Sequence, residues 1–211
     1  MTEEVTHNLR ADARENRDKI LDAARALFSE HGLEASMREV ARSAEVGPAT
    51  LYRRFPTKQA LIDDVFADEL RACRQVVADG CADPDPWRGF SSVIEGLSVL
   101  NVQNRGFVDA FMSANPQAPV FAHHRAALLP QLRALAARAK RTGQLRHDFA
   151  IDDLMLVLLA GRGLSSTSPA TRTVAARRLA ALALDAFREN ATNSTLPRKP
   201  RLVEEVVHIL Q

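Results

Sequence analysis

The stretch that decides the fold reads VGPATLYRRFPTK and occupies residues 46–58. Two prolines bracket only seven of its residues, which leaves room for about two turns of helix. A helix this short is not stable by itself in water, so it must pack against neighbouring helices. The same segment carries the only tyrosine of the chain, Tyr52, beside Arg53 and Arg54. We therefore expect a packed helix whose outer surface has a function.

The helical register divides this segment into an inner and an outer face. At about 100° per residue, Leu51 and Phe55 share one face, and we expect them to pack on the preceding helices. The remaining side chains lie on the other faces: Ala49 and Arg53 opposite the anchor, flanked by Thr50 and Tyr52, with Arg54 at the edge. The outer surface therefore combines small, phenolic and cationic groups.

A second short helix is predicted immediately before this segment. Ser36 and Glu39 have the spacing of a capping box, in which the serine hydroxyl accepts from the Glu39 amide and the carboxylate reaches back. A longer helix is expected from about Arg14 to Glu30, and residues 45–47 form a tight turn. Together these elements make a helix-turn-helix, whose second helix enters the major groove of DNA.

The residue types on the outer surface suit DNA. Arg53 can donate to a guanine or a phosphate, Tyr52 can reach a phosphate through its hydroxyl, and Ala49 permits close approach. A further capped helix begins near Lys58, where the cation and the free helix amides make a second phosphate site. Residues 36–62 hold five basic residues against two acidic ones, although the whole chain has a net charge of only +2.

The chain from Arg17 to Leu61 resembles the DNA-binding domain of the TetR family of transcriptional regulators. The matching runs are ILDAARALFSEHG, SMREVARSAEV and ATLYRRFPTKQAL, which begin at Ile20, Ser36 and Ala49. The resemblance implies an all-α homodimer with a three-helix DNA-binding head and a larger helical domain for ligand binding and dimerisation. It also implies that Ser36, Arg38, Tyr52 and Lys58 lie near phosphates, and that the groove-facing helix presents Pro48, Ala49, Thr50, Arg53 and Arg54.

Two positions depart from the family pattern. Glu45 stands where the turn usually has glycine, and Gly47 stands where the helix cap is usually serine or threonine. The hydroxyl contact of such a cap with a phosphate is therefore lost, and the charge of Glu45 would be unfavourable if it faced DNA. Neither change removes the apolar anchor or the cations.

Composition and length bound the rest of the chain. The 211 residues are 46% hydrophobic and 26% charged, with few aromatics and no strand pattern, which favours an all-α globular protein. The polar N-terminus has no signal-peptide core, and Cys73 and Cys81 form no metal or redox motif. We therefore expect a cytoplasmic protein without a cofactor or a metal. The predicted parts are a DNA-binding domain (1–57), an effector-binding and dimerisation domain (58–190) and a tail (191–211).

Helical spacing continues through the second domain, beginning with one long helix from Lys58 to about Asp79. Two polar residues, Asn101 and His124, interrupt apolar stripes, and burying either costs free energy unless it is hydrogen-bonded. The partner of each is either another group of the protein or a small molecule in an apolar pocket. For the second alternative, the predicted ligand-binding residues are Phe90, Leu97, Asn101, Phe107, Phe111, Met112 and His124.

The last two main helices are predicted over Ile151–Leu164 and from about Pro169 to Arg188. By resemblance, these two helices form a four-helix interface with those of a partner copy, since one face of the second carries small and apolar residues. The tail beyond them is expected to contain a short amphipathic helix, which either docks on the protein or seeks a partner. Its apolar positions are Leu202, Val203, Val206, Val207 and Leu210.

These features predict a sequence-specific DNA-binding transcriptional regulator, a repressor that a small-molecule effector releases from its double-stranded operator. The alternatives are a regulator without an effector, an activator, an enzyme or a structural adaptor. The sequence disfavours an enzyme because it has no Gly-rich phosphate loop, metal-ligand spacing or nucleophile elbow. The choice of repressor over activator rests on the resemblance alone.

Overall fold

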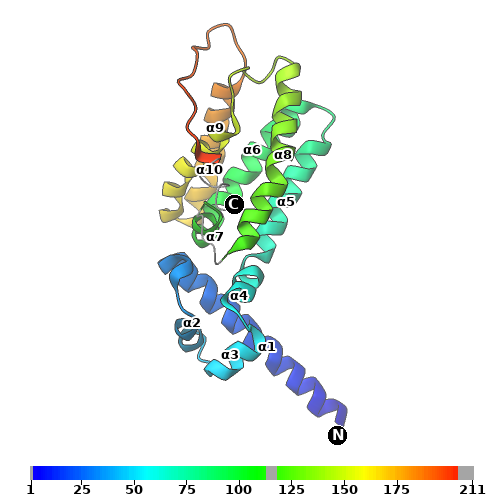
Figure 1. The fold of residues 1–211 in the computed structure, drawn as a ribbon, viewed down its shortest axis with the longest axis vertical. Coiled ribbons are helices and arrows are strands. Elements are labelled where there is room, and N and C mark those ends of the chain that lie inside the picture. Colours follow the sequence, from blue (N-terminus) through cyan, green and yellow to red (C-terminus); the bar gives the residue numbers. More distant parts are fainter. Residues whose placement is uncertain (1, 113–117, 204–211) are drawn as a thin grey trace. The chain divides into compact units, whose positions relative to one another are not determined.

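The computed structural model of the chain describes residues 2–112 and 118–203, and within these ranges it consists of helices with no named strand. The chain divides into two compact units, Met1–Ala67 and Asp68–Gln211, which we call the N-terminal unit and the C-terminal unit. Figure 1 shows both units as helical bundles. The division falls later than the predicted boundary at residue 58, so the helix that begins there belongs to the N-terminal unit.

The N-terminal unit is built around a long first helix. Its elements are α1 (Thr2–His31), the 3-10 turn η1 (Gly32–Glu34), α2 (Met37–Ser43), α3 (Pro48–Arg54) and α4 (Lys58–Val65). The helix α1 packs against α2 and α4 through fully buried side chains such as Ile20 and Phe28. It begins well before Arg14, the expected start, and the residues ahead of Arg14 include no Gly or Pro that would interrupt a helix.

The long helix predicted from Lys58 to Asp79 is wrong. The chain breaks at Phe66, whose φ and ψ are −108° and 11°, and then enters α5 (Ala67–Ala82). Phe66 is fully buried, and its ring centroid lies 6.1 Å from that of Phe28 in α1. Apolar residues recur at helical spacing on both sides of the break, so periodicity alone does not reveal it.

In the C-terminal unit, the helix α6 (Pro86–Gln103) lies at the centre. The other elements are α5, α7 (Arg105–Met112), α8 (Pro119–Arg141), α9 (Ile151–Gly161), the 3-10 turn η2 (Arg162–Ser166) and α10 (Pro169–Phe187). The helix α6 packs against α8, α9 and α10, and the Asp85 carboxylate caps it by accepting from the amides of Trp87 and Arg88 at 2.9 and 3.0 Å. The helix α9 ends at Gly161, earlier than the predicted Leu164, because the chain tightens into η2.

After α10 the described part of the tail returns along the C-terminal unit, coloured orange to red in Figure 1. Arg146, a buried arginine, donates to the carbonyl of Ser194 at 2.6 Å, and the amide of Leu196 donates to Asp148 Oδ2 at 3.0 Å. Most of the predicted amphipathic helix of the tail, residues 204–211, lies outside the described residues. Within the described ranges, no helix has the length and apolar character that a membrane span requires.

Candidate nucleic-acid interface and ligand pocket

The start of α2 is held by the predicted capping box. The amide of Glu39 donates to Ser36 Oγ at 3.2 Å, and the amide of Ser36 donates to Glu39 Oε2 at 2.6 Å. Hydrogen bonding of the Glu39 carboxylate to Ser36, first to its backbone amide and then to its side chain, lowers the pKa of Glu39. Ser36 and Arg38 remain exposed at this helix start, as the prediction of phosphate contacts requires.

The turn between α2 and α3 contains Glu45, which stands where the family pattern usually has glycine. Glu45 has a φ of 56°, the left-handed conformation that glycine adopts without strain. A glutamate there costs about 1 kcal/mol more than glycine, yet the turn closes through the amide of Val46, which donates to the carbonyl of Ala41 at 3.0 Å. The helix-turn-helix geometry is therefore retained.

The helix α3 is anchored by its two apolar side chains, as predicted. Leu51 is fully buried and Phe55 is 3% exposed, whereas Tyr52 on the other side is 46% exposed. Pro48 occupies the first helical turn behind Gly47, and the amides of Thr50 and Leu51 both donate to the Gly47 carbonyl. The short helix is thus stabilised by burial and capping, and its phenolic and cationic side is left in water.

Outward cations on α3 are available to an external partner. Among the residues that the structure describes, no carboxylate pairs with Arg53 or Arg54, and both side chains are exposed. At the next helix, Thr57 Oγ1 accepts from the amide of Ala60 at 3.1 Å and so caps α4 directly beside Lys58. None of the nine predicted DNA-contact positions is buried: Ser36, Arg38, Pro48, Ala49, Thr50, Tyr52, Arg53, Arg54 and Lys58.

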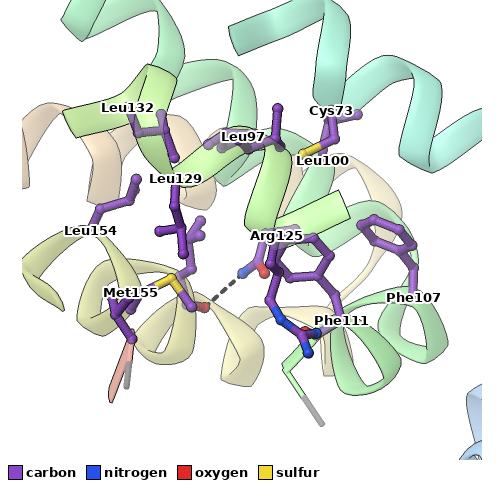
Figure 2. Close-up of a pocket in the computed structure, with 14 residues that line it drawn as sticks. Cys73, Leu97, Leu100, Phe107, Phe111, Arg125, Leu129, Leu132, Leu154 and Met155 are labelled. Atoms are coloured by element: carbon purple, nitrogen blue, oxygen red, sulfur yellow. Dashed lines mark hydrogen bonds between the residues drawn. The ribbon is translucent and has the colours of Figure 1, made fainter. Parts of the chain in front are cut away.

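A largely apolar cavity of about 60 Å³ lies inside the C-terminal unit. Figure 2 shows Leu129, Leu132 and Leu154 on one side of it, and Phe107, Phe111 and Arg125 on the other. The described residues that line it are Cys73, Leu97, Leu100, Asn101, Phe107, Phe111, Arg125, Leu128, Leu129, Leu132, Leu154, Met155, Leu158 and Val203. Burial raises the pKa of the Cys73 thiol to about 12, so Cys73 serves as a small apolar wall.

The structure brings four of the predicted ligand-binding residues to this cavity: Leu97, Asn101, Phe107 and Phe111. Phe90 lies elsewhere, in the core, where its ring meets that of Phe149 edge-on at 5.2 Å. His124 is buried and its ring lies 5.8 Å from that of Phe111, but it does not line the cavity. The side chain of Met112 lies outside the described part of the chain.

Both polar residues that interrupt the apolar stripes have a partner within the protein. Asn101 Nδ2 donates to the carbonyl of Leu158 at 2.7 Å and thereby ties α6 to α9. His124 Nδ1 lies 3.3 Å from Arg74 Nη1, and since arginine only donates, this ring nitrogen is the acceptor. Burial, followed by the charges of Arg74 and Arg125, lowers the pKa of His124 to about 4.

Arg125 and Val203 line the cavity although the sequence analysis did not select them. Arg125 is buried, its Nη1 donates to the carbonyl of Phe111, and its guanidinium carbon lies 5.7 Å from the Phe111 ring centroid. Val203 comes from the tail, where its amide donates to Asp152 Oδ1 at 3.0 Å. For Arg125, the position beside His124 on α8 was an available signal, whereas nothing local in the sequence links the tail to the cavity.

The outer surfaces of α9 and α10 expose apolar side chains. Leu156 is 45% exposed in α9, and Val174 and Leu182 are 68% and 58% exposed in α10. Large aliphatic side chains exposed on two adjoining helices favour contact with another protein surface. This surface includes Leu182, a member of the small and apolar face noted in the sequence.

Comparison with protein families gives two matches that together span most of the chain. Residues 20–65 match the model described as bacterial regulatory proteins of the tetR family. Residues 85–189 match the model described as the C-terminal domain of SbtR-like transcriptional regulators.

Individual proteins similar to this chain in sequence or fold are also described as transcriptional regulators. A TetR transcriptional regulator from Streptomyces coelicolor, SCO0520, is 33% identical, and the match covers 83% of this chain and 99% of that one, with a TM-score of 0.53. The ketosteroid transcriptional regulator KstR2 of Mycobacterium tuberculosis shares the fold at 17% identity, covering 82% of this chain and 95% of that one, with a TM-score of 0.63. The HTH-type regulator UidR of Escherichia coli K12 is 42% identical over 67 residues, which are 31% of this chain and 34% of UidR. The matched segment thus spans about a third of this curated relative.

Proposed function

The chain belongs to the TetR family of bacterial transcriptional regulators, and on that premise we propose that it is a DNA-binding repressor rather than an enzyme. The observation that carries the proposal is the short helix α3, with Leu51 buried and Tyr52 and Arg53 exposed. A helix held in this way presents its cationic side to the major groove of an operator. The protein then acts in the cytoplasm, where bacterial DNA lies.

The contacts of the N-terminal unit with DNA divide into two kinds. Arg53 on α3 reads a base edge, most favourably guanine, while Ala49 allows the helix backbone to come close. Phosphate contacts come from the starts of α2 and α4 and from Tyr52 on α3, and they position the unit without reading sequence. The side chains proposed for these contacts are Ser36, Arg38, Tyr52 and Lys58, with Pro48, Thr50 and Arg54 beside Arg53 on the groove-facing helix.

A homodimer fits both the exposed apolar surface and the reading of DNA. The partner copy would cover Leu156, Val174 and Leu182, and a two-fold dimer places its two α3 helices on half-sites a whole number of helical turns apart. A charge on this surface is expected to prevent association, so Leu182→Glu should sediment as a monomer in analytical ultracentrifugation. A dimer that withstands this change would place the interface elsewhere.

The cavity of the C-terminal unit is the proposed effector site. Its aliphatic walls suit an apolar molecule, and Arg125 and Asn101 supply the polar groups that would orient it. An effector that binds better to a conformer with wrongly spaced reading helices shifts the population away from DNA. Coupling of about 1–3 kcal/mol reduces operator affinity about 5- to 150-fold.

A binding assay on the DNA upstream of the chain's own gene tests the proposal. Fluorescence anisotropy at moderate salt is expected to show tighter binding to that fragment than to a shuffled fragment of equal composition. Equal affinity for both fragments would defeat the regulator assignment. A thermal-shift screen of small apolar molecules then tests the effector site, since a true effector raises the melting temperature and weakens operator binding.

A further inference from the structure

A shallow cavity of about 110 Å³ lies in the N-terminal unit between α1 and α3. Its walls are Asn16, Arg17 and Ile20 from α1, and Thr50, Arg53 and Arg54 from α3. Three arginines therefore line one concave surface, together with an asparagine and a threonine. The α1 residues Asn16 and Arg17 precede residue 20, where the match to the family model begins. This site is thus partly built from a segment outside the matched helix-turn-helix.

The charge balance around this cavity favours an anion. Arg53 and Arg54 have no carboxylate partner among the described residues, whereas Arg17 has two: Arg17 Nη2 lies 3.0 Å from Asp64 Oδ2, and Arg17 Nη1 lies 3.8 Å from Asp18 Oδ1. The side chains of Arg17, Asp64 and Asp18 are 35%, 44% and 69% exposed, and ion pairs so exposed contribute little to stability. Three like charges around one concavity repel one another, and a bound anion relieves that repulsion.

Guanidinium groups match the geometry of phosphate oxygens, because their planar donors form paired hydrogen bonds. Asn16 and Thr50 add neutral donors of the kind that commonly contact DNA phosphates. Arg17 reaches the cavity from α1 while Arg54 reaches it from α3, so one phosphate can be held between two helices. Arg53 stands at the rim, where it also belongs to the proposed base-reading surface.

We propose that Arg17 and Arg54 clamp one phosphate of the DNA backbone between α1 and α3. This contact rests on the proposed function. It adds a DNA contact from α1 to those of the helix-turn-helix. It is independent of base sequence, because phosphates carry no sequence information.

The salt dependence of operator binding tests this clamp in the full-length chain. Each neutralised phosphate contributes about −0.9 to the slope of log K against log salt concentration. Arg17→Ala is expected to flatten this slope by about one unit per half-site and to weaken binding several-fold. The order of preference among base substitutions in the operator should stay unchanged. A slope equal to that of the wild-type protein would overturn the clamp.

Two matched variants separate a phosphate contact from a structural role of Arg17. Asp64→Asn removes the ion pair but keeps the cation, so we expect operator binding as tight as in the wild-type protein, or tighter. Arg17→Lys keeps the charge and should retain most of the slope. If Asp64→Asn instead flattens the slope as much as Arg17→Ala, Arg17 acts through folding and the clamp is wrong.

The same measurements separate this inference from the function on which it rests. If the wild-type chain shows no sequence preference, the regulator assignment itself fails. If the wild-type chain prefers its operator while Arg17→Ala leaves the slope unchanged, only the clamp fails. Titration calorimetry with inorganic phosphate at constant ionic strength distinguishes a free anion as the ligand. If inorganic phosphate binds in a way that depends on Arg17 while Arg17→Ala leaves the salt slope for DNA unchanged, the ligand of this cavity is the free anion and the DNA clamp is wrong.

Discussion

The polar side chains proposed to bind partners differ in exposure between the two units: they are exposed in the N-terminal unit and buried in the C-terminal unit. In the N-terminal unit, Tyr52 and Arg53 stand in water, and no described carboxylate pairs with the arginine. In the C-terminal unit, Asn101 and His124 are buried and bonded to Leu158 and Arg74. A surface that binds a large anionic partner keeps its donors unused, whereas an enclosed site must satisfy its polar groups or lose stability.

This difference has a consequence for specificity. In the N-terminal unit, exposed side chains discriminate by the hydrogen bonds that they form with base edges. In the C-terminal unit, the side-chain nitrogen of Asn101 already donates to the protein, so the shape of the aliphatic walls, the Asn101 side-chain oxygen and the buried charge of Arg125 are left to select a ligand. Substitutions in one unit at a time test this contrast between exposed polar groups in the N-terminal unit and buried ones in the C-terminal unit.

The largest expected effect comes from removing the anchor of α3. Leu51 is fully buried, so Leu51→Ala deletes packed methyl groups and should lower the free energy of unfolding of the N-terminal unit by about 2–5 kcal/mol. Because a helix this short depends on the burial of its apolar side chains, operator binding should be lost as well. Hydrogen–deuterium exchange resolved by peptide measures the change in each unit.

Leu128→Ala is the matched control in the C-terminal unit, where Leu128 is 4% exposed and lines the cavity. It should raise exchange in α6 and α8 and leave the amides of α2 and α3 as protected as in the wild-type protein. Equal loosening of both units by either substitution would show that the two units unfold as one. The contrast drawn above would then have no energetic basis.

The next effect concerns the buried histidine of the C-terminal unit. The pKa of His124 is lowered from 6.5 to about 4, so below pH 6.5 the unfolded chain takes up a proton that the folded chain refuses. The free energy of unfolding therefore decreases as the pH is lowered from 6.5 to about 4, by about 3 kcal/mol in all. His124→Gln should remove this contribution. Urea unfolding of both proteins at a series of pH values gives the difference.

His147 supplies the matched control, because its side chain is 87% exposed. His147→Gln removes an exposed imidazole in place of the buried one, and its urea unfolding series is the reference for His124→Gln. A flat difference for His124→Gln would mean that the folded chain accepts the proton as readily as the unfolded one. In that case the C-terminal unit would not exclude charge at this position.

The helix-turn-helix could be predicted from sequence because local rules determine it. The capping box of Ser36, the proline at the start of α3 and the pair Leu51 and Phe55 each act within a few residues. The structure confirms these three features. The break at Phe66 was missed because it depends on burial against Phe28, a contact that sequence spacing does not encode.

The cavity was only partly predictable because distant segments build it. Leu97 and Phe111 were found from helical stripes, but Met155 and Val203 reach the cavity from α9 and the tail. Phe90 satisfies the same pattern and lies in the core, since an apolar stripe does not distinguish a cavity wall from packed interior. The burial of Asn101 and His124 was expected, and their internal partners were one of the two alternatives left open.

The third effect tests whether the exposed side of α3 reads bases. Arg53→Ala should cost about 1–3 kcal/mol of operator binding and relax the base preference at one position per half-site. Binding to a set of operators with single base changes measures both quantities. Arg53→Lys serves as the control, since it keeps the charge but loses the paired donors that recognise guanine.

If Arg53→Ala weakens all of these operators equally and also flattens the salt slope, Arg53 contacts a phosphate and not a base. The N-terminal unit would then owe its specificity to other groups on α3. An unchanged affinity for every operator would show that the exposed arginine makes no contact at all. Either result would weaken the contrast between the exposed side chains of α3 and the buried Asn101 and His124, each of which has one hydrogen-bond partner within the protein.

The smallest effect is expected at the start of α4. Lys58 begins the helix beside free backbone amides, so Lys58→Ala should flatten the salt slope by about one unit per half-site without changing base preference. Thr57→Ala is the control, because it removes the cap to Ala60 and costs about 1 kcal/mol of stability while leaving the charge in place. If only Thr57→Ala alters DNA binding, the start of α4 affects binding by stabilising the helix and not by contacting a phosphate. If only Lys58→Ala flattens the slope, the half-buried Lys58 is a phosphate contact, as the contrast between the two units requires.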